Sequence, residues 1–420
     1  MDKLHVRLLA VVAVFTVAAV IGMVVLWPDL PPRSQAAVTP LVDGVVRSAQ
    51  VVECPSEALV PVRPPCVRAE IEVLEGPGRG ATVDVDTGEQ GYPAFEVGEH
   101  VRVGDSTPPG GQPSYYVQDY ARLGPLTFLL GLFIVAVLGV GRWHGLRSLL
   151  GLGASLLVVI KFVIPAILAG ASPLAVALVG SFVVMLLTLY LCHGLNLKTT
   201  TALVGTAGAL CLIALLGVVF SELAKVTGLS SEEAQFVSLT VEGVNLQGLV
   251  LAGLIIGALG VLDDVTVSQA STVFAVHEAD PEQGWPTLFR RAMGVGRDHI
   301  ASVVNTLVLA YAGASIPLLI LFSTSGVAVR EIVNGEFVAQ EIVKTLIGSI
   351  GLVAAVPLTT ALAAGIATAA PRPPRRRRAA EAEAEAEAKA LDEEDHWLRA
   401  LRGDEPLGDD GPEAWPQQRR

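Results

Sequence analysis

Charged residues are scarce in most of this chain and missing from several long stretches. Only 17% of the 420 residues are charged, whereas 52% are hydrophobic. A soluble protein of this length carries charge along its exposed helices, so the composition argues against a soluble fold. Uncharged apolar runs of about 18 residues or more are typical of membrane helices, because about 20 helical residues cross a hydrocarbon core. The sequence therefore predicts an α-helical polytopic membrane protein.

Signatures of catalysis and nucleotide binding are also missing. The chain has no Gly-x-x-x-x-Gly-Lys-Ser/Thr loop, so ATP-driven work would need a separate subunit. It has neither a Gly-x-Ser-x-Gly elbow nor a His-Glu-x-x-His motif. The net charge of −12 lies largely in the C-terminal tail and the hydrophilic segments, which leaves no basic surface for nucleic acid. We expect no enzyme activity, no cofactor and no nucleic-acid partner.

Cysteine is rare, and its placement is informative. Cys192 and Cys211 lie in or beside apolar runs, where a small buried side chain is the usual interpretation. Cys54 and Cys66 belong to the hydrophilic segment after the first run. If that segment is exported, an oxidising environment permits a Cys54–Cys66 disulfide, and the sequence leaves this possibility open.

The apolar runs predict eight transmembrane helices. They cover residues 8–27, 123–140, 149–169, 174–191, 201–220, 246–262, 301–322 and 342–369. The first run follows Lys3 and Arg7 and is longer than the apolar core of a cleavable signal, which favours an uncleaved signal-anchor.

Basic residues of the short loops predict the orientation. Lys198, Arg290 and Arg291 would share one side of the membrane with the basic cluster at 375–378. By the positive-inside rule this side is the cytoplasm, so both termini are expected there, in a bacterial cell membrane. The expected divisions are a signal-anchor (1–27), an extracytoplasmic domain (28–122), a seven-helix bundle (123–370) and a charged, low-complexity cytoplasmic tail (371–420).

Residues 28–122 have a different pattern from the rest of the chain. Alternating or β-branched stretches at 45–52, 67–73, 81–85 and 97–103 are separated by Gly- and Pro-rich turn signals. The pattern predicts a small β-barrel-like domain of about five strands, similar to OB or SH3 folds.

Two adjacent carboxylates at the end of the 246–262 run are the most unusual polar feature. Asp263 and Asp264 are costly in a membrane unless they reach water, a cation or a partner. A helix rises about 1.5 Å per residue, so a helix that starts on the outer side of the membrane brings Asp263 near the cytoplasmic surface. A simple helix end is therefore an equally good interpretation. Gly253, Gly257 and Gly260 precede the pair and predict either close helix packing or a helix break.

Lys161 and Asn305 are further polar residues within apolar runs. Lys161 lies toward the outer half of its predicted helix, and a pair with Asp263 is not supported by their depths. Asn305 is more often an interhelical hydrogen-bonding residue than a ligand.

The predicted cytoplasmic loop after Asp264 contains His277 and the triplet Arg297, Asp298 and His299. Imidazole and carboxylate groups can bind a metal or relay protons, although the spacing does not place two ligands on one helix face. Metal binding is left open. Residues 288–300 could instead form an amphipathic helix on the membrane surface.

Three stretches resemble the YibE/F-like family of bacterial multi-pass membrane proteins. They are residues 193–200 (HGLNLKTT), 257–271 (GALGVLDDVTVSQAS) and 291–307 (RAMGVGRDHIASVVNTL), the last continuing through 310–317. The resemblance spans about residues 35–370 and leaves out the tail. It implies a permease-like membrane protein, supplies no substrate, and draws attention to Gln269 as well as to Asp263, Asp264, Arg297, Asp298, His299 and Asn305.

Two functions fit these observations. The first is a permease for an unknown small solute or ion, coupled to ions or protons, with Lys161, Asp263, Asp264, Gln269 and Asn305 as pathway candidates. The second is a cell-envelope scaffold or sensor that binds an envelope component through the exported domain. We expect the lipid bilayer as a partner, and a homo-oligomer is compatible with either function.

Overall fold

A computed structural model describes residues 3–28, 41–52, 66–76, 78–87, 95–107, 114–241 and 243–369. The chain forms two compact units. One unit comprises Gly22–Gly194 with Val237–Asn245, and the other comprises Met1–Ile21, Leu195–Phe236 and Leu246–Arg420. The predicted tail at 371–420 and Cys54 lie outside the described residues, so the Cys54–Cys66 disulfide stays a prediction.

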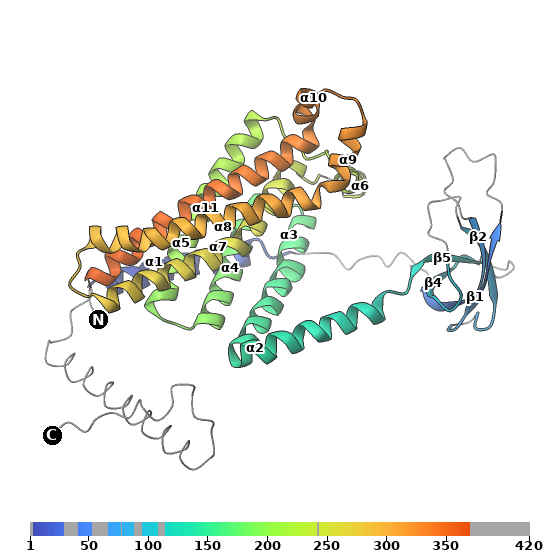
Figure 1. Ribbon diagram of the computed structural model, residues 1–420, viewed down its shortest axis with the longest axis horizontal. Coiled ribbons are helices and arrows are strands. Elements are labelled where there is room, and N and C mark those ends of the chain that lie inside the picture. Colours follow the sequence, from blue (N-terminus) through green and yellow to red (C-terminus); the bar gives the residue numbers. More distant parts are fainter. Residues whose placement is uncertain are drawn as a thin grey trace, which may run out of the picture. The chain divides into compact units, whose positions relative to one another are not determined.

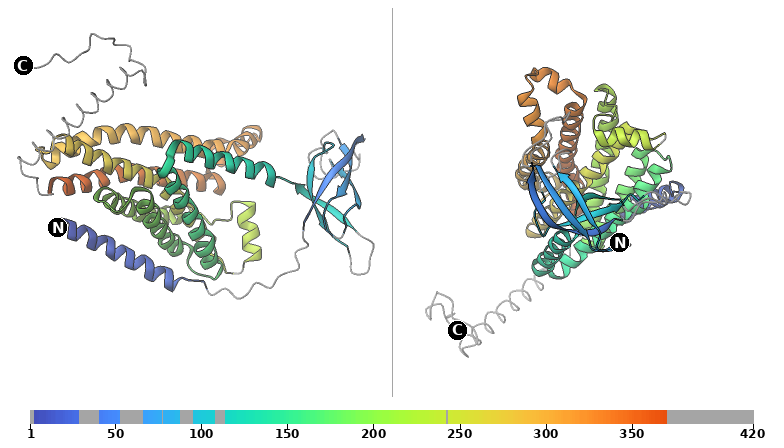
Figure 2. Two further views of the ribbon diagram at one scale, coloured as in Figure 1. Left: turned by 90° about the horizontal axis from the view of Figure 1, so that it is seen from below. Right: turned by 90° about the vertical axis from the view of Figure 1, so that its right-hand side faces the viewer.

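A five-stranded antiparallel sheet forms the N-terminal part of the Gly22–Gly194 unit (Figures 1 and 2). Its strands are β1 (Val42–Val52), β2 (Cys66–Val73), β3 (Thr82–Thr87), β4 (His100–Asp105) and β5 (Tyr115–Tyr120). Their order in the sheet is β3-β2-β1-β4-β5, and β1 carries an irregularity between Val46 and Ser48. The sheet curls so that its edge strands β3 and β5 approach each other. The sequence indicated four of these strands, whereas β5 was not recognised.

Alternation of side chains explains the sheet's core. Val101 and Val103 of β4, Ile71 and Val73 of β2, and Val46 of β1 are all buried in one cluster. Residues between them face outward, because side chains alternate along a strand. Asp43 and Arg102 lie opposite each other on β1 and β4 and form an ion pair.

The same unit contains a long apolar helical run after the sheet. It comprises α2 (Leu123–Val158), η1 (Val159–Val163) and α3 (Ile164–Leu168), and α4 (Pro173–His193) packs against α2. Within α2, Arg142 has a non-helical backbone with φ of 47°. A side-chain carbon at Gly145 would lie 2.3 Å from the Val137 carbonyl oxygen, although residues eight apart in a straight helix are about 12 Å apart. The helix therefore bends sharply at Arg142, between the two predicted runs 123–140 and 149–169.

Lys161 lies in the π-helical turn η1 and is exposed. Pro165 has no N–H with which to bond the Lys161 carbonyl four residues earlier. The amide of Ile164 instead donates to the Val159 carbonyl, five residues back. The proline therefore accounts for the wider turn.

The other unit is helical. Its helices are α5 (Leu197–Leu223), α7 (Leu246–Ala279), α8 (Trp285–Ala314), α9 (Ile316–Thr324), α10 (Val329–Asn334) and α11 (Glu336–Ala369). The short helix α6 (Glu232–Thr240) and the N-terminal helix α1 (Lys3–Val25) each have residues in both units. Helices α5, α7, α8 and α11 lie side by side, as the green, yellow and orange ribbons of Figure 1 show.

Glycines allow α5 and α11 to approach closely. Gly205 faces Thr359, and farther along the pair Gly351 faces Ile213. Between these two contacts the residue number rises along α5 and falls along α11, so the two helices are antiparallel. Small residues at such positions let helix backbones come together, as is typical of membrane helix interfaces.

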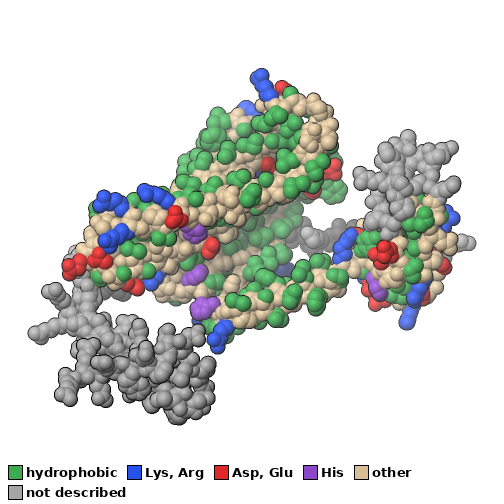
Figure 3. Space-filling model, in the orientation of Figure 1, with side chains coloured by type: hydrophobic (Ala, Val, Ile, Leu, Met, Phe, Trp, Pro, Cys, Tyr) green, Lys and Arg blue, Asp and Glu red, His purple; other side chains and the backbone are tan. Residues whose placement is uncertain are grey.

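Within the described residues, five helical segments are long and apolar enough to cross a membrane, or six if the bent pair α8–α9 counts as one span. The five are Leu123–Leu168, Pro173–His193, Leu197–Leu223, Leu246–Ala279 and Glu336–Ala369. Large hydrophobic side chains are exposed along several of them, including Phe128 and Leu132 of α2, and Figure 3 shows them over much of the helical surface. Such surface is costly in water, which indicates a membrane protein. The count of eight spans stays a prediction.

The region after Asp264 differs from the prediction. Residues 263–300 were expected to form mainly a cytoplasmic loop, but α7 continues to Ala279 and α8 begins at Trp285. The amphipathic segment 288–300 is thus the first half of α8. Helix α7 is unbroken at Asp263. The three glycines expected to allow close packing also do not pack against other described residues, because a side-chain carbon added at Gly253, Gly257 or Gly260 would have no neighbouring atom within 4 Å.

Candidate functional site

A layer of buried polar side chains crosses the interior of the α5–α7–α8–α11 bundle. We call this the polar layer and define it as Thr206, Thr266, Gln269, Thr359 and Thr360. Each of these side chains is at most 1% exposed. Because buried polar groups in a membrane helix are costly unless they are hydrogen-bonded, such a layer is a candidate functional site.

Two hydrogen-bonded pairs join the helices within the polar layer. The Thr206 and Thr266 hydroxyl oxygens lie 2.6 Å apart and link α5 to α7, with either hydroxyl able to donate. The Gln269 amide nitrogen donates to the Thr360 hydroxyl at 2.8 Å and to the Ala292 carbonyl at 3.2 Å. Gln269 therefore connects α7 to both α11 and α8.

Thr359 is the exception among the threonines of the polar layer. Thr206 and Thr360 donate to carbonyls one turn earlier in their own helices, at Ala202 and Val356. Among the described residues, the Thr359 hydroxyl is buried and has no hydrogen-bond partner. It points at Gly205 of α5, where a side chain would collide with it. Thr359 is thus the unsatisfied hydroxyl of the polar layer and lies next to the Thr206–Thr266 pair; elsewhere in the bundle, the Ser221 and Ser349 hydroxyls are also buried without a partner among the described residues.

Asp263 lies one turn before Thr266 on α7. Its backbone carbonyl oxygen lies 3.3 Å from the Thr266 hydroxyl oxygen, and its carboxylate oxygen Oδ1 is buried. Because α7 extends from Leu246 to Ala279, Asp263 is near the middle of a helix about 50 Å long. The alternative interpretation of Asp263 as a simple helix end does not hold, since the helix continues for four more turns. A carboxylate this far from both helix ends, next to the polar layer, can bind a cation or exchange a proton.

Two further pathway candidates in this unit, Asp264 and Asn305, lie apart from the polar layer. Asp264 is exposed on the neighbouring face of α7. Asn305 is exposed on α8, and the contact between Gln269 and Ala292 places it about 10 Å along the bundle from the level of Asp263. Lys161 belongs to the other unit. Of the four pathway candidates in this unit, only Asp263 and Gln269 therefore lie in or beside the polar layer.

The residues expected in a cytoplasmic loop flank a tight helix–helix turn. His277 is near the end of α7, where Glu278 pairs with Lys198 of α5 at 3.3 Å. Asp280 in the turn pairs with Arg291 of α8 at 3.0 Å. Arg297, Asp298 and His299 lie farther along α8, the first two exposed. Within the described ranges, no three His, Cys, Asp or Glu side chains are placed to hold a metal ion.

The threonines of the polar layer were missed in the sequence. A threonine within an apolar run usually bonds to its own helix, so its presence says little about function. A usable signal was the alignment of Asp263, Thr266 and Gln269 at intervals of three, which places them along one side of a helix.

The described structure is therefore that of a helical membrane protein with a small curled β-sheet and a polar layer inside one helical unit. The family model of YibE/F-like proteins matches residues 129–369, more than half of the chain. The chain belongs to the YibE/F-like family, as its motifs suggested. No curated protein and no solved structure matches it significantly.

Proposed function

We propose that the α5–α7–α8–α11 bundle carries a small polar solute or ion across the membrane, bound at the polar layer and coupled to ions or protons through Asp263. The observation that carries this proposal is the Thr359 hydroxyl, which is fully buried and has no hydrogen-bond partner among the described residues. An unsatisfied buried hydroxyl costs about 1–3 kcal/mol. A bound solute would offset that cost by bonding to the hydroxyl.

The neighbouring groups favour transport over catalysis. The polar layer consists of hydroxyl and amide groups, which bind solutes and ions reversibly, and the adjacent Asp263 supplies a titratable charge. Ionisable groups in this setting are typical of ion and proton pathways. The five side chains that define the layer include no nucleophile–base pair.

Replacing Thr359 by valine tests the proposal, because valine keeps the side-chain shape and removes the hydroxyl. The full chain would be reconstituted in proteoliposomes, and uptake of radiolabelled inorganic ions and small polar solutes measured under an imposed pH gradient. We expect T359V to lower transport by at least about tenfold without lowering stability. The matched control is T306V, because Thr306 is exposed on α8 and donates to the Ser302 carbonyl of its own helix.

Asp263→Asn tests the coupling. We expect the variant to lose the dependence of transport on the pH gradient, since asparagine does not titrate. Unchanged transport by T359V would remove the polar layer from the pathway. If the wild-type chain moves no solute faster than empty liposomes do, the alternative of an envelope scaffold or sensor gains support.

We also infer eight spans in the bacterial cell membrane, with both termini in the cytoplasm and an exported OB-like domain. The bend at Arg142 supports two spans within Leu123–Leu168. The approach of edge strands β3 and β5 supports a partly open barrel. A cysteine introduced at Arg79 should react with a membrane-impermeant maleimide in intact cells, whereas one at Arg290 should react only after permeabilisation.

A further inference from the structure

A cavity of about 330 Å³ lies between the end of α8, helix α9 and the first turns of α11. It exists because α8 and α9 meet at an angle of 61°. The bend falls at Ser315, two residues before Pro317, whose ring is incompatible with continuing a regular helix at this point. The cavity is separate from the polar layer, because Glu341 precedes Thr359 by about 27 Å of helix.

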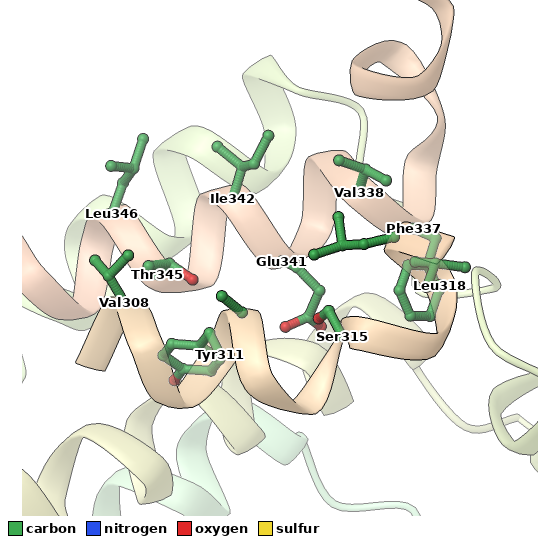
Figure 4. Close-up of a pocket in the computed structure, with 12 residues that line it drawn as sticks. Val308, Tyr311, Ser315, Leu318, Phe337, Val338, Glu341, Ile342, Thr345 and Leu346 are labelled. Carbon is green, nitrogen blue, oxygen red and sulfur yellow. The ribbon is translucent and has the colours of Figure 1, made fainter. Parts of the chain in front are cut away.

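Apolar side chains form most of the cavity wall, and polar groups meet near its centre. Figure 4 shows the Glu341 carboxylate next to Ser315, with the Tyr311 ring close by. Apolar side chains, including those of Phe337 and Leu346, lie toward the two ends. An apolar cavity with a few convergent polar groups is the usual form of a small-molecule site.

Among the described residues, Glu341 is the only charged one in the cavity wall. Its Oε1 atom accepts a hydrogen bond from the Lys344 ammonium at 2.8 Å, one turn farther along α11. The side chains of Lys344 and Glu341 are 23% and 28% exposed, so the pair is only partly hydrated. A carboxylate has about four lone-pair positions, and the Lys344 bond uses one of them. Glu341 can therefore accept a second cationic donor.

We infer that this cavity binds a lipophilic organic ammonium ion, that is, a protonated amine carrying a small aryl or alkyl group. The carboxylate of Glu341 would hold the ammonium, and the apolar ends of the cavity would hold the hydrocarbon. The Tyr311 and Phe337 rings add two surfaces that attract a cation. The volume is near the lower end of the range for ligand pockets, which limits the ligand to a compact molecule. This inference does not rest on the proposed transport function.

Replacing Lys344 or Glu341 should change the affinity for the ammonium ion in opposite directions. Lys344 competes with the ligand for the same carboxylate, so removing its charge should strengthen ammonium binding. Removing the Glu341 charge should weaken binding. If the Lys344–Glu341 pair served stability alone, both replacements would disturb the same interaction. Neither would then change the binding of an ammonium ion relative to the binding of an uncharged molecule of similar shape.

The experiment uses the full chain in lipid nanodiscs and the probe 2-phenylethylammonium, with neutral 2-phenylethanol as its matched control. Binding of radiolabelled probe is measured by scintillation proximity relative to empty nanodiscs. We expect the ammonium to bind more tightly than the alcohol, and E341Q to weaken its binding by at least about tenfold. K344M should strengthen it by about two- to fivefold, the range expected for a partly exposed ion pair. E331Q is the control for removal of a carboxylate, since Glu331 is exposed on α10.

Equal binding of the ammonium and the alcohol would overturn the inference and would favour an ordinary lipid chain as the occupant. Wild-type affinity in E341Q, or weaker binding in K344M, would also overturn it. If E341Q cannot be purified as folded protein, K344M and the two probes on the wild-type chain still decide the question. An A312F variant, which fills the cavity from α8, should abolish binding of both probes.

Discussion

Replacing Gly205 by alanine tests the packing of α5 against α11 at the polar layer. A side-chain carbon at this position would lie 2.2 Å from the Thr359 hydroxyl oxygen, 3.1 Å from its Cβ and 3.4 Å from its Cα. Ordinary van der Waals contact begins near 3.4 Å. The new methyl group would thus approach the hydroxyl more than 1 Å too closely.

The overlap can be relieved in two ways, and each has a cost. Thr359 can rotate within a buried site, or α5 and α11 can separate and lose contacts along their length. Insertion of a methyl group into a packed core typically costs about 1–3 kcal/mol, and we expect a loss of stability in that range. Adding Thr359→Ala removes the hydroxyl and leaves only the 3.1 Å contact with Cβ. The double variant should therefore recover most of the loss.

The assay is reversible unfolding of the purified full chain in mixed detergent micelles, followed by circular dichroism. Gly253→Ala is the matched control, because Gly253 is in helix α7 and a side-chain carbon there would meet no described atom within 4 Å. It should leave stability unchanged or raise it, since alanine is the better helix former by about 1 kcal/mol. The reasoning is refuted if G205A is as stable as G253A, or if Thr359→Ala gives no recovery.

Two further predictions concern hydrogen bonds. Gln269→Leu removes two interhelical bonds, each worth about 0.6 kcal/mol in membrane proteins, so stability should fall by about 1 kcal/mol; a fully stable Q269L would contradict the assignment. In the β-domain, the hydrogen bond from Arg122 is the main cause that lowers the pKa of Asp119 below its usual 3.8. The resulting stabilisation is present above the unfolded pKa and is lost as pH falls through the lower folded value, below about pH 4. Arg122→Gln should move the Asp119 titration midpoint up toward 3.8 in ¹³C NMR of aspartate-labelled protein, and an unchanged midpoint would rule out Arg122 as the cause.

The sequence alone established that this is a helical membrane protein of the YibE/F-like family. Hydrophobicity is a local property, so an uncharged apolar run such as Pro173–His193 reveals a span without knowledge of its neighbours. The alternating pattern of Val101 and Val103 likewise predicted a strand with one buried face. Family membership depends on short motifs, which are visible in the sequence itself.

The extent of α7 and α8 depended on tertiary structure. The charges after Asp263 marked the end of an apolar run, and the sequence prediction placed the end of the helix there. A helix continues as long as its backbone bonds and its packing favour it, and pairs such as Arg291–Asp280 stabilise the turn that joins α7 to α8. Hydrophobicity therefore located the membrane-like part of α7 but not its end.

The polar layer could be recognised only in the folded bundle. Thr206, Thr266 and Thr359 are unremarkable in sequence, because a threonine hydroxyl can bond to its own helix wherever it occurs. The approach of α5, α7 and α11 decides which hydroxyls meet a partner across the bundle and leaves Thr359 without one among the described residues. These contacts join positions 60 or more residues apart, and their geometry follows from helix packing rather than from any local pattern.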